Sequence, residues 1–170
     1  MTSLSTLLLS DAALLSKLQT ETFTQAYRGV LSDDDINLYC EQNFSVAKAS
    51  AILGSQQYLC KSIHHLGSIA GFYTISFQAC PIELCEQSAE LKQIYILARS
   101  YGTGVGKCLF EDVILELRER HYSWVWLAVS DINYRARSFY QKLGFDELGN
   151  GPTFNVGSDQ LSSTLLARQV

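Results

Sequence analysis

A glycine-rich turn between an apolar strand and an amphipathic helix constrains this chain more than any other feature. The turn covers residues 101–107 (YGTGVGK), and the expected helix continues to about Arg120. Alternating glycines let the backbone turn tightly and point several N–H groups in one direction. At a helix N-terminus those N–H groups, the helix dipole and Lys107 favour a phosphate or pyrophosphate. The turn therefore predicts an anion site, with a purely structural turn as the alternative.

The spacing of apolar residues predicts one mixed α/β domain over residues 1–170, with helices packed on a central sheet. Ser32 is placed to cap a helix, and Gly71 marks a bend or bulge within a strand. Besides the helix after the glycine turn, helices are expected at residues 11–23, from residue 33 onward, at 43–53 and at 133–143. Strands are expected at residues 4–9, 57–64, 68–79, 89–97, 124–129, 144–148 and 163–168.

Composition and charge argue against several classes of protein. The 170 residues carry a net charge of −4 with scattered basic side chains, so no nucleic-acid partner is expected. No apolar run has the length of a membrane span, and the N-terminus lacks the basic start of a signal peptide, so a cytoplasmic location is expected. The histidines show no metal-ligand spacing, and no C-x-x-C pair occurs. We therefore expect no metal site and no disulfides, but small buried thiols in a reducing cytosol at Cys40, Cys60, Cys80, Cys85 and Cys108.

Two common phosphate-binding motifs do not fit the glycine turn. A P-loop requires a glycine five residues before its Gly-Lys pair, and a serine or threonine after it. Those two positions hold Tyr101 and Cys108. A dinucleotide fingerprint requires G-x-G-x-x-G, whereas the chain has Gly102, Gly104 and Gly106 at even spacing. Neither kind of nucleotide site is therefore expected.

The turn and a second motif further along the chain resemble the GNAT acetyltransferase superfamily. The turn is similar to that family's acetyl-CoA motif, Gln/Arg-x-x-Gly-x-Gly/Ala, but Tyr101 replaces the leading Gln or Arg. The second motif, Asn-x-x-Ala-x-x-Phe-Tyr-x-Lys-x-Gly-Phe, is matched at Asn133, Ala136, Phe139, Tyr140, Lys142, Gly144 and Phe145. The resemblance implies a mixed, mostly antiparallel sheet flanked by helices. It also implies an enzyme that transfers acetyl from acetyl-CoA to a small-molecule primary amine.

The resemblance further implies which residues bind the co-substrate. In the family the strand before the turn splays from its neighbour, and free backbone groups, here those of Ile94, Tyr95 and Ile96, pair with the pantetheine arm. One of these N–H groups would face the thioester oxygen as an oxyanion donor. Asn133 would bind the arm as well as cap its helix. The pyrophosphate would lie on the turn formed by Tyr101, Gly102, Thr103, Gly104, Val105, Gly106 and Lys107.

Two side chains are implied to be catalytic. The match places Tyr140 beside the sulfur, where its phenol can protonate the departing thiolate; a tyrosine simply packed in its helix is the alternative. Glu90 precedes the pantetheine-binding stretch, where some family members keep a base that deprotonates the substrate ammonium. A solvated carboxylate at the strand end is the alternative for Glu90. Strict alternation would put Glu90, Lys92, Ile94 and Ile96 on one face of the strand.

The sequence indicates the acceptor amine less clearly than it indicates the co-substrate. Residues 21–27, 89–96 and 154–159 resemble the bacterial polyamine (spermidine/spermine) N-acetyltransferase branch, in which case Asp33–Asp35 would rim a polyamine entrance or only cap a helix. A peptide or protein N-acetyltransferase, a non-catalytic acetyl-CoA sensor and an interaction domain are the other interpretations. The acceptor site is expected to be lined by the N-terminal helices and by loops at 80–88 and 149–160. Homodimers are common in the family, so a homodimer is left open here.

Overall fold

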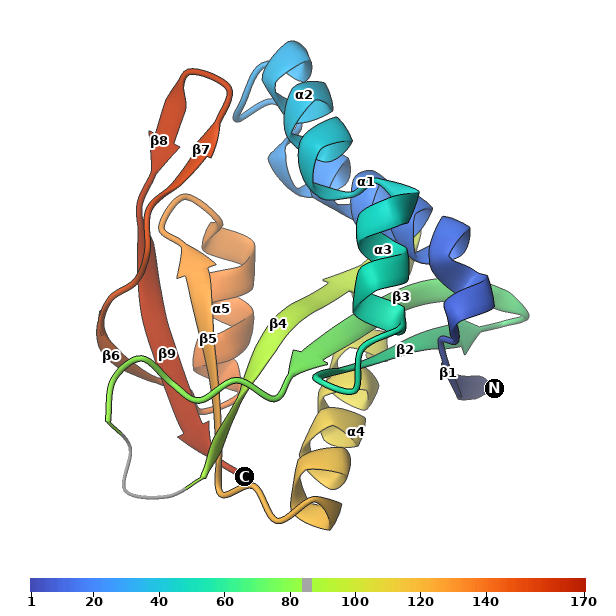
Figure 1. The fold of residues 1–170 in the computed structure, drawn as a ribbon, viewed down its shortest axis with the longest axis vertical. Coiled ribbons are helices and arrows are strands. Elements are labelled where there is room, and N and C mark those ends of the chain that lie inside the picture. Colours follow the sequence, from blue (N-terminus) through green and yellow to red (C-terminus); the bar gives the residue numbers. More distant parts are fainter. Residues whose placement is uncertain (84–86) are drawn as a thin grey trace.

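A seven-stranded sheet forms the centre of the fold in the computed structural model, which describes residues 1–83 and 87–170 (Figure 1). Its strand order is β1-β2-β3-β4-β5-β9-β6. Every neighbouring pair is antiparallel except β4 and β5, which run parallel. The prediction of a mixed, mostly antiparallel sheet flanked by helices is therefore confirmed.

The elements follow the expected order, with one addition. The sheet contains β1 (Thr2–Thr6), β2 (Tyr58–His65), β3 (Ser68–Ser76), β4 (Ser88–Ile96), β5 (Trp124–Ser130), β6 (Asp146–Asn150) and β9 (Ser163–Gln169). The helices are α1 (Ala12–Tyr27), α2 (Asp33–Asn43), α3 (Val46–Leu53), α4 (Val105–Glu119) and α5 (Tyr134–Lys142). The addition is a separate hairpin of β7 (Phe154–Val156) and β8 (Asp159–Leu161), where only a loop was expected.

Local side-chain hydrogen bonds explain where the N-terminal boundaries differ from expectation. The first strand, expected at 4–9, ends at Thr6, because the Asp11 carboxylate accepts from the Leu8 N–H (2.8 Å) and starts a short 3₁₀ turn. The first helix runs on to Tyr27. The helix expected at 43–53 begins only at Val46, because the Ser45 hydroxyl accepts from the Lys48 N–H (3.3 Å) and caps it there.

Helices cover both faces of the sheet. On one face, α1 and α3 bury an apolar cluster that includes Leu15, Ala49 and Phe72. On the other face, α4 and α5 bury the larger cluster, which extends from β2 and β3 to β5 and β9. The thiols of Cys40 and Cys60 are buried as predicted, Cys80 and Cys108 are half-buried, and Cys85 lies outside the described residues.

A polar network joins α4 to the sheet beside the larger cluster. The Lys61 ammonium pairs with Asp112 (3.0 Å) and with Glu116 (2.6 Å), and the Tyr73 hydroxyl donates to Asp112 (2.6 Å). Because these groups are largely shielded from water, their mutual pairing holds α4 at a fixed position on β2 and β3. The N-terminus of α4, which carries the glycine turn, is thereby held in place.

The strands β4 and β5 separate after a short shared stretch. They pair only at Ser88–Trp124, Ala89–Val125 and Glu90–Trp126. Beyond these pairs the two strands diverge, as Figure 1 shows, while β4 stays paired with β3 up to Ile96. One edge of β4 therefore keeps backbone groups that no strand covers, in the stretch where the sequence predicts a ligand.

Candidate active site

A pocket of ≈ 550 Å³, here called the turn pocket, lies where β4, the glycine turn and α5 meet. Most of the residues predicted to bind the co-substrate line it: Ile94, Tyr95, Ile96, Tyr101, Gly102, Gly104, Gly106, Lys107 and Asn133. Three predicted residues do not, and one of them, Tyr140, lines a neighbouring cavity instead. The side chain of Val105 is buried in the core, and the Thr103 hydroxyl donates to the Ser100 carbonyl (2.7 Å).

The backbone of the glycine turn is shaped to hold an anion. Gly104 caps α4 in the left-handed conformation (φ +83°), which favours glycine. The first intrahelical hydrogen bond runs from the Cys108 N–H to the Gly104 carbonyl (3.2 Å), so the preceding amides of Val105, Gly106 and Lys107 are the open amides of the helix start. A Cβ on Gly106 would lie 3.3 Å from the Phe139 ring. Glycine at position 106 therefore leaves room for the Phe139 ring beside these open amides.

Tyr101 is paired with a cation from another element. The guanidinium of Arg135, on α5, lies 3.5 Å from the centre of the Tyr101 ring. Both residues line the turn pocket, together with Lys107 and Lys142. Tyr101 replaces the Gln or Arg of the family motif, and the stacked Arg135 brings a positive charge back to that position. Sequence reasoning missed Arg135, because no local pattern links residues 101 and 135.

We expect Arg135→Ala to weaken the binding of acetyl-CoA by about three- to tenfold, because an exposed charge beside phosphates contributes modestly. Tyr101→Phe keeps the ring on which Arg135 stacks, so this variant is expected to bind acetyl-CoA with unchanged affinity. Isothermal titration calorimetry with acetyl-CoA measures both. Arg118→Ala removes an exposed arginine of α4 outside the pocket and serves as the control. Unchanged affinity in Arg135→Ala would show that the stack is only structural.

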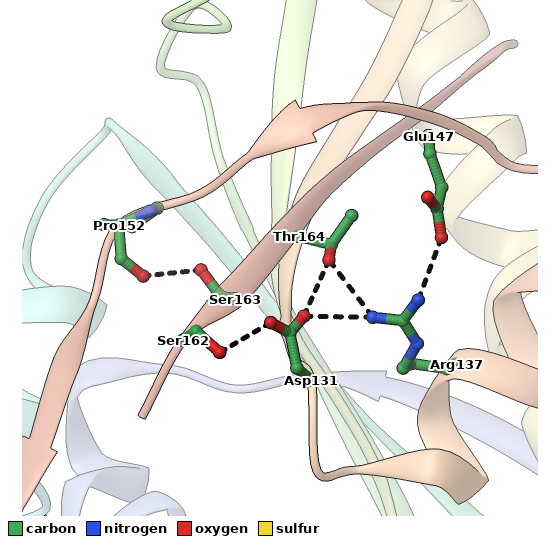
Figure 2. A network of polar contacts seen from close by, with 7 residues as sticks. All are labelled: Asp131, Arg137, Glu147, Pro152, Ser162, Ser163 and Thr164. Atoms are coloured by element: carbon green, nitrogen blue, oxygen red, sulfur yellow. Dashed lines mark hydrogen bonds and ion pairs between the residues drawn. The ribbon is translucent and has the colours of Figure 1, made fainter. Parts of the chain in front are cut away.

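The start of α5 is fixed by a cap and by a polar network. The Asn133 side chain accepts from the Ala136 N–H (3.2 Å), so the predicted cap is present. Just before it, Asp131 accepts from Arg137 (3.0 Å) and from the Ser162 and Thr164 hydroxyls (both 2.6 Å), as Figure 2 shows. These contacts tie α5 to β9 and set the direction in which Asn133 faces the turn pocket.

Asp131→Asn is expected to lower the melting temperature by about 2–4 °C at pH 7, because the network is partly exposed to water. Hydrogen bonds from Ser162 and Thr164, together with Arg137, lower the pKa of Asp131 below its unfolded value. Its stabilisation is therefore present above the unfolded pKa and is lost as pH falls through the lower, folded pKa. Melting curves between pH 2 and pH 7 measure this, and a difference between variant and wild type that stays constant to the acid end contradicts it.

A second cavity of ≈ 390 Å³, here called the aromatic pocket, adjoins the turn pocket. It shares Ile94, Tyr95 and Asn133 with the turn pocket, so the two meet where β4 leaves β5. Its walls come from α1, α2, α3, β4, β5, α5 and the hairpin. They include Gln19, Phe23, Tyr27, Tyr39, Phe44, Glu90, Lys92, Gln93, Ser130, Tyr140 and Phe154.

A β-bulge decides which β4 side chains face the aromatic pocket. Thr74 pairs with Gln93 and Ile75 with Leu91, so Lys92 is an extra residue in β4. The prediction that strict alternation puts Glu90 on the same face as Ile94 and Ile96 was therefore wrong. Glu90 lies on the same face as Gln93, while Ile94 and Ile96 pack against the larger core cluster on the opposite face. The bulge thus brings Glu90 to the aromatic pocket, which it lines.

The two predicted catalytic side chains line the aromatic pocket, where Tyr140 is buried and Glu90 is half-buried. Burial raises the pKa of the Tyr140 phenol, with a further rise from nearby Tyr27. Burial also raises the pKa of Glu90, although the positive charge of Lys92 opposes this rise. Tyr140 and Asn133 stand two turns apart on α5, and therefore face the same way. The phenol is thus placed close to the point where the two pockets meet.

The three aspartates at the start of α2 do not line the aromatic pocket. Ser32 caps this helix by accepting from the Asp35 N–H (3.1 Å), and Asp33–Asp35 lie in its first turn, where they favour the helix dipole. Of the expected loops, residues 149–160 contribute Phe154, whereas residues 84–86 of the other loop lie outside the described residues.

The order of elements, the splayed strands and the glycine turn match a known group of enzymes. Residues 16–145 match the acetyltransferase (GNAT) family. The chain belongs to this family. As a GNAT protein it is an acetyl-CoA-dependent N-acetyltransferase, so the predicted enzyme class and co-substrate are confirmed. The turn pocket offers the open amides and cations that this co-substrate requires.

Individual relatives agree with the family assignment. An uncharacterised N-acetyltransferase of Mycobacterium tuberculosis is 26% identical over 162 residues, which cover 95% of this chain and 99% of that protein. The ribosomal-protein-bS18-alanine N-acetyltransferase of Haemophilus influenzae is 39% identical over 74 residues, 44% of this chain and 49% of that protein. The structure of PaiA N-acetyltransferase from Thermoplasma acidophilum in complex with coenzyme A matches with a TM-score of 0.83 and 18% identity, covering 100% of this chain and 99% of that one. This last likeness shows the GNAT fold alone.

Within 1–83 and 87–170, no three His, Cys, Asp or Glu side chains group as a metal ion would require. In the same ranges no helix has the length and apolar character needed to cross a membrane.

Proposed function

We propose that this GNAT enzyme acetylates a small primary amine by direct attack within a ternary complex. The observation that carries the proposal is the meeting of the turn pocket and the aromatic pocket at Ile94, Tyr95 and Asn133. An amine in the aromatic pocket and a thioester in the turn pocket would lie against each other at this point. Holding both reactants there removes much of the entropic cost of their encounter.

Each implied catalytic group has a defined task in this reaction. Acetyl-CoA supplies a thioester; the C–N bond to the amine forms and the C–S bond breaks. Glu90 takes the proton that the ammonium must lose before attack. A backbone N–H of Ile94, Tyr95 or Ile96 stabilises the charge that develops on the carbonyl oxygen. Tyr140 keeps its proton at neutral pH and gives it to the departing sulfur.

Polyamines and peptides are two more specific candidates for the acceptor. The polyamine assignment relies on the three similar stretches of sequence, and Glu90 offers one carboxylate to a cation. A peptide acceptor is favoured by the 39% identity with the ribosomal-protein-alanine enzyme, although that match covers only 44% of this chain. A non-catalytic sensor is disfavoured, because a buried phenol and a half-buried carboxylate in one pocket are typical of a site for proton transfer.

Initial rates measured while both acetyl-CoA and the amine are varied test the ternary complex. Direct attack predicts double-reciprocal lines that intersect, because both substrates must be bound before either product leaves. Parallel lines would mean that the acetyl group is first carried on the protein, and would contradict the proposal.

A further inference from the structure

Five aromatic side chains from separate segments form one wall of the aromatic pocket. Phe23 and Tyr27 come from α1, Tyr39 from α2, Phe44 from the residue after α2, and Phe154 from β7. The Phe23 and Tyr39 rings stack with centres 4.5 Å apart and planes 11° apart. Phe44 meets both rings edge-on, at 5.5 and 5.7 Å, and Phe154 lies 6.5 Å from Tyr39. Because the rings hold one another, the wall has a set shape before a substrate enters.

Charged groups are scarce in the same pocket. Among its described lining residues, the carboxylate of Glu90 is the only acidic group and Lys92 the only cation. A polyamine that pairs one ammonium with Glu90 would have to place the next one beside Lys92 or against the rings. An ammonium against the rings would lose its water without gaining a counter-ion, because no second carboxylate is among the described lining residues. The charge pattern therefore fits a substrate with a single ammonium group.

The hairpin closes the pocket on the side of α2. Val156 and Leu161 of the hairpin share one buried cluster with Ile36 and Cys40 of α2. At the hairpin tip, Gly157 approaches Asp35 so closely that a Cβ would have no room. Because Phe154 of the hairpin and Tyr39 of α2 both line the pocket, this packed contact bounds it there and favours a small acceptor over a longer chain.

We infer that the acceptor is a small monoamine that carries an aromatic or similarly flat apolar group. The ammonium lies against Glu90, near the junction of the two pockets, and the flat group packs against Phe154 and the stacked pair of Phe23 and Tyr39. The Ser130 hydroxyl is buried in this pocket without a hydrogen-bond partner in the described residues, although it is near enough to Tyr27 to lower that phenol's pKa. It is available to accept a hydrogen bond from the amine. This specificity rests on the proposed function, because it assigns the second substrate of the same site.

A panel of matched amines tests the inference. With saturating acetyl-CoA, kcat/KM is measured for phenethylamine, for the non-planar 2-cyclohexylethylamine, for spermidine and for a short peptide with N-terminal alanine. We expect phenethylamine to exceed spermidine and the peptide by at least about tenfold, and cyclohexylethylamine by a smaller factor.

Variants of the lining residues test whether the aromatic wall causes the preference for phenethylamine. Phe154→Ala is expected to lower kcat/KM for phenethylamine by about tenfold without changing KM for acetyl-CoA, and Phe154→Leu, which keeps apolar volume, by less. Lys92→Glu adds a second carboxylate and is expected to improve spermidine relative to phenethylamine. Tyr134→Ala removes a tyrosine that is 76% exposed and lines neither pocket, so it should leave the ranking unchanged.

The outcomes separate the inference from the proposed function. Faster turnover of spermidine or of the peptide by the wild-type enzyme would overturn the inferred specificity but leave amine acetylation intact. Turnover of no amine would contradict the proposed function itself. In that case calorimetry on the CoA-bound protein decides the specificity, and tighter binding of spermidine than of phenethylamine would overturn it.

Discussion

Tyr140→Phe is expected to lower kcat by about 10²- to 10⁴-fold while leaving the affinity for acetyl-CoA unchanged. The Tyr140 side chain is 8% exposed and lines the aromatic pocket, not the turn pocket, so the co-substrate does not need it for binding. Burial raises the pKa of its phenol, which therefore stays protonated through the physiological range. Phenylalanine keeps the packing of the ring and removes the hydroxyl that carries this proton. Steady-state kinetics and calorimetry with acetyl-CoA measure the two effects separately.

An acetyl donor with a more acidic thiol distinguishes acid catalysis from a structural role. Such a thiolate leaves without a proton, so Tyr140→Phe should recover much of its rate with this donor. Tyr134→Phe, an exposed site on the same helix, is the matched control and should behave like wild type. A Tyr140→Phe enzyme with normal kcat would remove the phenol from the mechanism, and one that no donor rescues would show that the hydroxyl does not act as the acid for the leaving thiolate.

Glu90→Gln is expected to lower kcat by about a hundredfold and to remove the acid limb of its pH profile. Glu90 accepts a proton only when ionised, and burial raises its pKa, although Lys92 opposes the rise. Activity should therefore fall on the acid side at a higher pH than an ordinary carboxylate would cause. The profile of kcat against pH for wild type and variant measures this.

Lys92→Met provides a matched test of the same group. Lys92 opposes the rise in the pKa of Glu90, so its removal should move the acid limb to higher pH while Glu90 remains in place. If the acid limb is unchanged in both Glu90→Gln and Lys92→Met, another group controls it. Glu90 would then line the pocket without acting as the base.

The features that sequence predicts best here depend on short-range interactions. Asn133 caps α5 through its own neighbour Ala136, and Gly104 adopts the left-handed conformation within the turn itself. These interactions span a few residues, so residue type and spacing are enough to indicate them. The same holds for Ser32 at the start of α2.

The features that sequence did not predict depend on contacts between distant segments. The bulge at Lys92 exists because β3 sets the register of β4, and no pattern within β4 reveals it. The stack of Arg135 on Tyr101 joins α5 to the glycine turn. The aromatic wall likewise combines α1, α2 and β7. The hairpin is different, because Gly157-Ser158 between two β-prone segments is a recognisable two-residue turn that sequence reasoning could have used.

Mass spectrometry of the amine product, paired with titration of the released CoA thiol, tests the central claim most directly. Acetyl-CoA is incubated with enzyme in the presence and absence of phenethylamine, with spermidine and the alanine peptide in parallel. The account predicts that thiol release requires an amine, and that one N-acetylated amine appears for each thiol released. Binding of acetyl-CoA without any amine-dependent thiol release, or release without an acetylated amine, would contradict it.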